Sequence, residues 1–214
     1  ATISKRRRDY KTSYGKGISR TPRKVMTKRG TQFYWVGAFA PQTVGGRRAH
    51  PPKAEKIWEQ KINKKERKKA IRSALSATAK LELVKLRGHK VEYLPLIIEN
   101  KVGDVKNTGD VKKILLSLGL EKELKRIEKR KVRAGRGKSR GRKYKIKRGP
   151  LIVTSQECPL HRSVRNIQGI DVCVVNNLNA ELLAPGTVPG RLTIFTEDAI
   201  TLLRERKIFL EHGT

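Results

Sequence analysis

Positive charge is the feature that most limits how this chain can fold. The sequence has 51 lysines and arginines against 19 acidic residues, which gives a formal net charge of +32 on 214 residues. Such a charge opposes compaction unless a polyanion neutralises it. No apolar run approaches the roughly 18 residues that a membrane-spanning helix requires. We therefore expect a nucleic-acid partner and no membrane contact.

Residues 1–53 are predicted to form an extended basic arm with no core of its own. This segment has fourteen lysines and arginines, one acidic residue and six of the eleven aromatic residues. The aromatic residues show neither a helical period nor the alternation of a hairpin, and glycines and prolines interrupt the segment repeatedly. We expect it to be disordered alone and to become ordered on phosphates. Planar side chains such as Trp35 and Phe39 can stack on unpaired bases, as they do in RNA-binding surfaces.

Residues 54–214 are predicted to form an α/β domain with a single core. Short apolar runs rich in β-branched residues predict strands within residues 94–100, 149–155, 171–175 and 191–196. Amphipathic segments between and after them predict helices within residues 63–80, 82–87, 110–120, from Glu121, and 197–210. Asn63 and Thr196 are the expected N-caps of the first and last helices. Strands alternating with helices predict a three-layer domain with a mainly parallel sheet.

A basic glycine-rich loop is expected at residues 129–148, KRKVRAGRGKSRGRKYKIKR. Twelve of its twenty residues are Lys or Arg and none is acidic. Gly137, Lys138 and Ser139 match the end of a nucleotide-binding P-loop, but Val132 stands where the first glycine should be. The segment before the loop reads as a charged helix instead of a strand, and no amphipathic helix follows. The pattern therefore predicts contact with a phosphate backbone, not with one nucleoside triphosphate.

Candidate catalytic groups are few. Asp171, Glu197 and Asp198 are the only carboxylates near expected strand ends, and the last two can simply complement a helix dipole. Cys158 and Cys173 lie in apolar stretches without a CxxC pattern, which favours buried thiols over a disulfide or a zinc site. We expect no enzyme activity, no cofactor and no metal. A regulatory nucleic-acid binder that acts alone remains an alternative.

Five long blocks of this sequence resemble one known family. They are APQTVGGRRAHPPK at 40–53, INKKERKKAIRSALSATA at 62–79, RGHK at 87–90, RAGRGKSRGRKYK at 133–145 and LNAELLAPGTVPGRLTIFTEDAI at 178–200. Together they are similar to the ribosomal protein L four family of the large subunit, in its archaeal and eukaryotic form, and the resemblance covers almost the whole chain in the family's order.

The resemblance implies a function in the cytoplasm as a structural constituent of the large ribosomal subunit. In that family the α/β domain binds ribosomal RNA on the outer face of the subunit, beside neighbouring ribosomal proteins. A long extended loop helps to line the exit tunnel of the nascent peptide. By position, the tip of that loop should fall within YGKGISRTPRKVMTKRG at 14–30.

Two features depart from the family pattern. The chain begins at ATISKRRRDYK, which already resembles the ascending limb of the loop, so we expect the family's first strand and helix to be missing and the sheet to be incomplete. The long basic C-terminal extension of eukaryotic members is also absent, which makes an archaeal source the better expectation.

The residues expected to contact RNA are basic side chains, flexible glycines and a few planar rings. In the arm they are Arg6, Arg7, Arg8, Lys11, Lys16, Arg20, Arg23, Lys24, Lys28, Arg29, Trp35, Gly45, Gly46, Arg47, Arg48, His50 and Lys53. In the domain they are Lys64, Lys65, Arg133, Arg136, Lys138, Arg140, Arg142, Lys143 and Tyr144. Two of the rings allow two interpretations. His50 can stack on a base or be merely solvated, and Tyr144 can stack on a base or pack back onto the sheet.

Overall fold

The structure is a computed structural model that describes residues 9–11, 14–25 and 33–209. The chain divides into two compact units, Ala1–Gln60 and Lys61–Thr214. Each unit is described below by itself.

The larger unit is built on a four-stranded parallel sheet. Its strands are β4 (Leu96–Ile98), β7 (Leu151–Thr154), β8 (Asp171–Val174) and β9 (Thr193–Thr196). They lie in the order β4-β9-β7-β8, and each neighbouring pair is parallel. All four residues of β7 are buried, as expected for a central strand that is covered on both faces. The four strands fall within the four segments that the sequence predicted.

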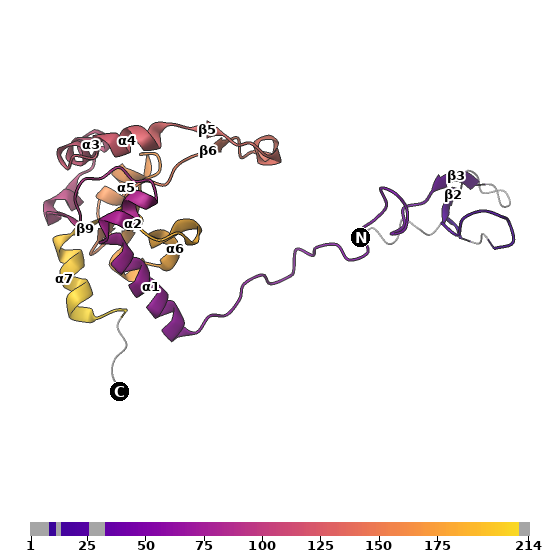
Figure 1. The fold of residues 1–214 in the computed structure, drawn as a ribbon, viewed down its shortest axis with the longest axis horizontal. Coiled ribbons are helices and arrows are strands. Elements are labelled where there is room, and N and C mark those ends of the chain that lie inside the picture. The colour runs from indigo at the N-terminus through magenta and orange to yellow at the C-terminus, as the bar shows by residue number, and fades with distance from the viewer. Residues whose placement is uncertain (1–8, 12–13, 26–32, 210–214) are drawn as a thin grey trace. The chain divides into compact units, whose positions relative to one another are not determined.

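Helices cover both faces of this sheet. They are α1 (Lys64–Thr78), α2 (Leu81–Leu86), α3 (Thr108–Ser117), α4 (Glu121–Glu128), α5 (Leu160–Arg165), α6 (Ala180–Leu183) and α7 (Glu197–Arg206). Apolar residues of α2 to α5 form one core cluster with Ile152 and Ile194 of the sheet. Those of α1, α6 and α7 form a second cluster with Leu151 and Val153. Alternate strand residues thus face opposite helical layers, which confirms the predicted three-layer α/β fold (Figure 1).

The helix ends differ from prediction in detail. Asn63 and Thr196 directly precede α1 and α7, as expected of N-caps, but neither makes a side-chain capping hydrogen bond. The last helix ends at Arg206 because Lys207 takes a left-handed conformation with φ +43°. In α1 the buried stripe is narrower than the sequence suggested, since Ala70 and Ala79 are exposed.

The smaller unit contains a three-stranded antiparallel sheet. Its strands are β1 (Asp9–Tyr10), β2 (Arg23–Val25) and β3 (Phe33–Gly37), paired in that order. The prediction of an arm without hairpin pairing is therefore wrong for the described residues. Strands of two and three residues are too short to show an alternating pattern, and the β2–β3 register shifts between Arg23 and Val25. Backbone hydrogen bonds pair these strands, and β1 and β2 are too short to show a period that the sequence could reveal.

Candidate nucleic-acid interface

The basic run at residues 129–148 folds as a hairpin, called here the basic hairpin. Strands β5 (Lys131–Val132) and β6 (Tyr144–Lys145) pair antiparallel, and a 3₁₀ turn, Arg136–Arg140, forms the tip. The backbone N–H of Arg133 donates to Lys143 O at 2.9 Å, and that of Arg142 donates to Gly137 O at 3.0 Å. Gly141 closes the turn in the left-handed region with φ +78°. The hairpin projects from the α/β layers (Figure 1).

The basic hairpin presents its cations to solvent. Exposed cationic side chains are those of Arg136, Lys138, Arg140, Arg142 and Lys143. Arg133 is half-buried and its Nε donates to Arg142 O at 3.2 Å, so it also braces the loop. A rigid backbone with mobile charged ends suits phosphates spaced along a nucleic-acid strand.

Tyr144 lies on the hairpin and not in either core cluster. Its ring is 46% exposed, with Lys143 Nζ 5.6 Å and Arg130 Cζ 5.9 Å from the ring centroid. Of the two interpretations that the sequence allowed, the structure does not support packing onto the sheet. A half-exposed ring between cations can accept a stacked base.

The buried carboxylate of Glu123, which was not predicted from the sequence, helps to anchor the base of the hairpin to the domain. Glu123 Oε1 lies 2.6 Å from His89 Nδ1 and 2.6 Å from Arg126 Nη2. Glu123 Oε2 accepts from the backbone N–H of Lys90 at 3.0 Å. Burial opposes ionisation, but hydrogen bonds from Arg126, His89 and Lys90 outweigh it and lower the pKa of Glu123 to about 2. Arg126 also donates to Arg148 O at 2.7 Å, which holds the returning end of the hairpin.

A second buried ion pair holds the same end. Arg191, 1% exposed, donates from Nη2 to Asp171 Oδ2 at 2.6 Å and from Nε to Gly149 O at 3.0 Å. Arg148 Nη1 lies 3.2 Å from the same Asp171 oxygen. Burial lowers the pKa of Arg191, and the pairing with Asp171 opposes that shift. Asp171 is the first residue of β8. Because it contacts both Arg148 and Arg191, we interpret it as a structural ion-pair partner.

In the arm, residues 40–48 form a tight turn that requires glycine. Gly45 has φ +70°, and a Cβ on Gly46 would lie 1.8 Å from Ala40 O. The N–H of Gly46 donates to Thr43 O at 2.9 Å. The turn leaves Arg48 exposed and Arg47 half-buried. His50 and Lys53, just after it, are also exposed.

The remaining described cations of the arm fall into two groups. Lys11, Lys16, Arg20 and Lys24 are exposed. Lys16 lies over the Tyr10 ring, and Arg20 lies over Tyr14 at 5.4 Å. Arg23 is different, because it is only 7% exposed and donates to Ser19 O at 2.8 Å and Thr21 O at 3.1 Å. Arg23 therefore braces the arm's turn, and its expected contact with RNA stays a prediction.

Two tryptophans in the smaller unit are open to solvent. Trp35 is 72% exposed and borders a cavity of about 410 Å³ that Thr21 and Thr43 also line. Trp58 is 70% exposed, with Lys56 Nζ 4.7 Å from its ring centroid. The sequence analysis did not select Trp58, although a tryptophan among lysines, Lys53, Lys56 and Lys61, carries the signal used for Trp35.

Lys64 and Lys65 are exposed in the first turn of α1. Arg6, Arg7, Arg8, Lys28 and Arg29 lie outside the described residues.

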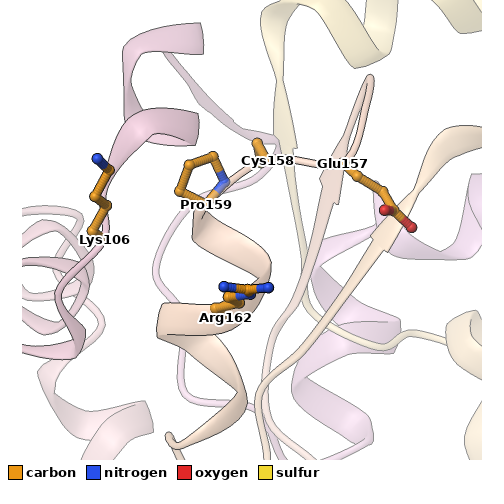
Figure 2. Close-up of a pocket in the computed structure, with 5 residues that line it drawn as sticks. All are labelled: Lys106, Glu157, Cys158, Pro159 and Arg162. Carbon is orange, nitrogen blue, oxygen red and sulfur yellow. The ribbon is translucent and has the colours of Figure 1, made fainter.

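Other kinds of site have little support in the structure. A shallow cavity of about 520 Å³ lies beside α5, with Lys106 and Arg162 on its walls (Figure 2). Burial raises the pKa of the Cys158 thiol at this cavity, which disfavours a reactive thiolate. Burial also raises the pKa of Cys173 to about 12. Within residues 9–11, 14–25 and 33–209, no three acidic, histidine or cysteine side chains are grouped as metal ligands, and no helix is long and apolar enough to cross a bilayer.

Comparison with known proteins decides the family. A sequence profile described as Ribosomal protein L4/L1 family matches residues 1–206. The chain belongs to this family. A large ribosomal subunit protein uL4 from Nanoarchaeum equitans is 52% identical over 210 residues, which are 98% of this chain and 78% of that protein. Membership of a family of ribosomal proteins confirms the resemblance stated above and the expectation of a non-enzyme.

Further archaeal relatives agree with the archaeal type expected from the sequence. The uL4 protein of Methanoculleus marisnigri is 50% identical over 193 residues, which are 89% of this chain and 74% of that protein. The uL4 protein of Methanosphaera stadtmanae is 46% identical over 193 residues, which are 88% of this chain and 72% of that protein.

Proposed function

We propose that this chain is a structural constituent of the large ribosomal subunit that binds the ribosomal RNA of that subunit in the cytoplasm. Its relatives are named as proteins of the large subunit, and family membership carries that assignment to this chain. Neighbouring large-subunit proteins are its other expected partners.

The observation that supports RNA binding best is the basic hairpin. Its backbone is held by its own hydrogen bonds and, at its base, by contacts of Arg148 with Arg126 and Asp171, so its cations are positioned before RNA arrives. Five exposed Lys and Arg side chains surround the tip, and no acidic residue lies within 129–148 to offset them. Charge-assisted contacts of this kind set affinity, whereas the shape of the folded RNA sets specificity.

The arm is proposed to reach the exit tunnel and to contact the nascent peptide near its tip. Support comes from the order of the chain, because residues 14–30 lie between the two limbs of the arm, and from the family pattern. Exposed Lys16, Arg20 and Lys24 suit a wet passage walled by RNA phosphates. The exposed ring of Trp35 on the returning limb suits stacking on an unpaired base.

A charge-neutralised hairpin tests this proposal. Replacing Arg136, Arg140, Arg142 and Lys143 with Gln should lower affinity for large-subunit RNA by about a hundredfold to a thousandfold, at about 0.7 to 1 kcal/mol per phosphate contact. The matched control replaces four exposed lysines on α3 and α4, which are Lys112, Lys113, Lys122 and Lys125. Three of these already pair with Asp110, Glu92 and Glu121, so their loss should weaken binding much less.

The results distinguish the proposed function from three alternatives. Equal losses for the two variants would mean that bulk charge, not the hairpin, carries RNA binding. Unfolding of the hairpin variant, seen as a lost circular dichroism signal, would make those residues structural. Native lysate sedimented in high magnesium should place the chain with the large subunit, whereas a regulator that acts alone would remain near the top of the gradient.

A further inference from the structure

A small acidic cavity at the carboxyl edge of the parallel sheet is unrelated to the basic hairpin. It has a volume of about 250 Å³ and is called here the acidic cavity. Its lining includes Asn100, Asp104, Thr154, Glu157, Thr196 and Asp198. They follow three neighbouring strands, β4, β7 and β9. In a protein of net charge +32, three carboxylates in one small cavity are an exception.

The cavity lies at the point where two neighbouring strands of the sheet are followed by helices on opposite faces. Strands β7 and β9 are parallel neighbours, but the chain leaves them toward opposite faces. After β7 it enters α5, which packs in the core cluster with Ile152, and after β9 it enters α7, which packs in the cluster with Val153. In open α/β sheets, ligands bind in the crevice that forms at such a point.

A buried hydroxyl group without a partner lines this cavity. Thr196 is 3% exposed, and its Oγ1 has no hydrogen-bond partner among the residues that the structure describes. A buried hydroxyl that forms no hydrogen bond is destabilising, so such groups are normally paired. Thr196 precedes α7 and could have capped it, but its side chain makes no cap hydrogen bond. This oxygen has almost no accessible surface, so a ligand in the cavity reaches it only after the Thr196 side chain rotates toward the cavity.

The carboxylates around Thr196 favour a cation. Asp198 Oδ1 accepts from Asn100 Nδ2 at 2.7 Å, and Asp198 N donates to Asn100 Oδ1 at 3.0 Å, which fixes this carboxylate across the ends of β4 and β9. Figure 2 shows the Glu157 side chain pointing away from Lys106. Within the described part of the chain, Asp104, Glu157 and Asp198 form no ion pair. An anion such as phosphate would be repelled by all three.

We propose that the acidic cavity binds a primary alkylammonium group through the carboxylate of Asp198 and the hydroxyl of Thr196. An ammonium group has three N–H donors and no acceptor, so it matches a cavity that offers carboxylate and hydroxyl oxygens. The volume is too small for a drug-sized ligand but can hold an ammonium group with its methylene chain. The group can come from a free polyamine or from a lysine side chain of a neighbouring protein. This site is independent of RNA binding.

Titration of the isotope-labelled full chain with propylammonium chloride tests the site. We expect saturable shifts of the backbone amide signals of residues 154–157 and 196–198 in the millimolar range. Tetramethylammonium has the same charge but no N–H donor, so it should give no saturable shift. If magnesium chloride shifts these signals and propylammonium does not, the site is a metal site and the proposal is wrong. Absence of saturation with every probe also overturns it.

Three variants assign the contacts. Asp198→Asn should weaken propylammonium binding at least fivefold. Glu197→Gln is the matched control, because Glu197 lies in the same first turn of α7 but does not line the cavity, and its binding should be unchanged. Thr196→Val should weaken binding at least threefold while raising the urea midpoint of the free chain, because it removes an unpaired hydroxyl. Equal binding by all three variants would contradict the proposal.

The source of the ammonium group is distinguished in assembled large subunits. A carbodiimide joins a carboxylate to an amine that touches it. A cross-link from Asp198 to a lysine of another protein identifies a protein partner, and a spermidine adduct on Asp198 identifies a free polyamine. Absence of both products, while Glu197 reacts with added amine, would overturn the proposal for the assembled particle. Affinity for RNA should be the same in Asp198→Asn as in the unaltered chain, so failure here does not affect the proposed RNA binding.

Discussion

At the scale of single residues, Glu123 connects three segments at the base of the basic hairpin. It is fully buried and contacts His89, Lys90 and Arg126, and Arg126 in turn holds Arg148 at the end of the basic hairpin. One carboxylate thus connects the segment after α2, helix α4 and the hairpin. The positions of the cations that we propose to contact RNA thus depend on a group that is itself buried in the domain.

Replacing Glu123 with Gln should destabilise the chain by about 3 kcal/mol at pH 7, because the pKa is lowered from 4.5 to about 2 in the folded state. A group with a lowered folded-state pKa stabilises the fold fully above its unfolded value, and this contribution is lost as the pH falls through the folded value. The difference between the two proteins in urea unfolding should therefore shrink between pH 4.5 and about 2.

Glu121→Gln is the control for this measurement. Glu121 lies in the same helix, but it is exposed and pairs only with Lys125 one turn later. Because solvent screens this exposed pair, its removal should change stability far less than Glu123→Gln does. A stability difference for Glu123→Gln that does not vary with pH would show that packing, not charge, is what the residue contributes.

At the scale of elements, the hairpin decides between two interpretations of Gly137-Lys138-Ser139. A P-loop needs a helix whose first amides face the phosphates. Here Ser139 Oγ donates to Arg136 O at 2.8 Å, and Lys138 lies in a 3₁₀ turn that ends at Arg140. The structure therefore shows no P-loop here, and contact of this motif with a phosphate backbone stays a prediction.

The chain should accordingly not bind ATP or GTP. Lys138→Ala should lower affinity for RNA by about tenfold or less, the effect of one phosphate contact. Fluorescent-nucleotide titration of the free chain checks the first point, and filter binding checks the second. Saturable nucleotide binding that disappears in Lys138→Ala would restore the P-loop interpretation. Ser139→Ala is a useful companion, since it removes only the hydroxyl group of the turn.

Elements with a continuous apolar run were predictable from the sequence, and elements held by backbone pairing were not. Strand β7, Leu151–Thr154, is buried at every residue, so its run of β-branched residues is a direct signal. Strands β1 and β2 have two and three residues and no apolar face, so no period could reveal them. The main α/β layers follow from periodicity, whereas the arm's sheet depends on contacts between distant segments.

The same distinction applies to the candidate site. Exposed cations of the hairpin follow from charge density alone, because a run of twelve basic residues in twenty cannot be buried. Arg23 and Glu123 could not be assigned in this way. Arg23 is buried by carbonyl groups of its own turn, and Glu123 by a histidine 34 residues away. Local composition gives the type of a charged residue but not the partner that decides whether it faces solvent.

At the scale of the whole molecule, RNA binding should depend strongly on salt. Because the net charge is +32, we expect the chain to make at least six phosphate contacts. Each contact releases counterions from the RNA. Affinity for large-subunit RNA should fall about a thousandfold or more between 50 and 200 mM monovalent salt. Filter binding across that range gives the slope. A nearly flat response would reject the electrostatic account, and the four-residue hairpin variant should show a shallower slope than the control on α3 and α4.

The arm and the α/β domain should be separable in function. Both core clusters are formed by residues from Ile71 onward, so removal of residues 15–40 takes away no part of either cluster. Large subunits carrying this deletion should therefore still contain the chain. Their exit tunnel should be wider where the arm is missing, and their response to tunnel-binding drugs should change. An electron cryomicroscopy map of the purified subunits measures the first effect, and drug binding to them measures the second.

The matched variant for this deletion shortens the basic hairpin instead, by replacing residues 134–142 with two glycines. This change also leaves both core clusters intact, but it removes the cations that we propose to dock the domain on RNA. We expect it to lower the occupancy of the chain in purified subunits while the tunnel of the occupied particles stays unchanged. If instead the arm deletion abolishes incorporation and the hairpin deletion does not, the arm docks the protein. An unaltered tunnel in subunits that contain the shortened arm would refute the proposed place of its tip, because residues removed from a wall must leave a wider passage.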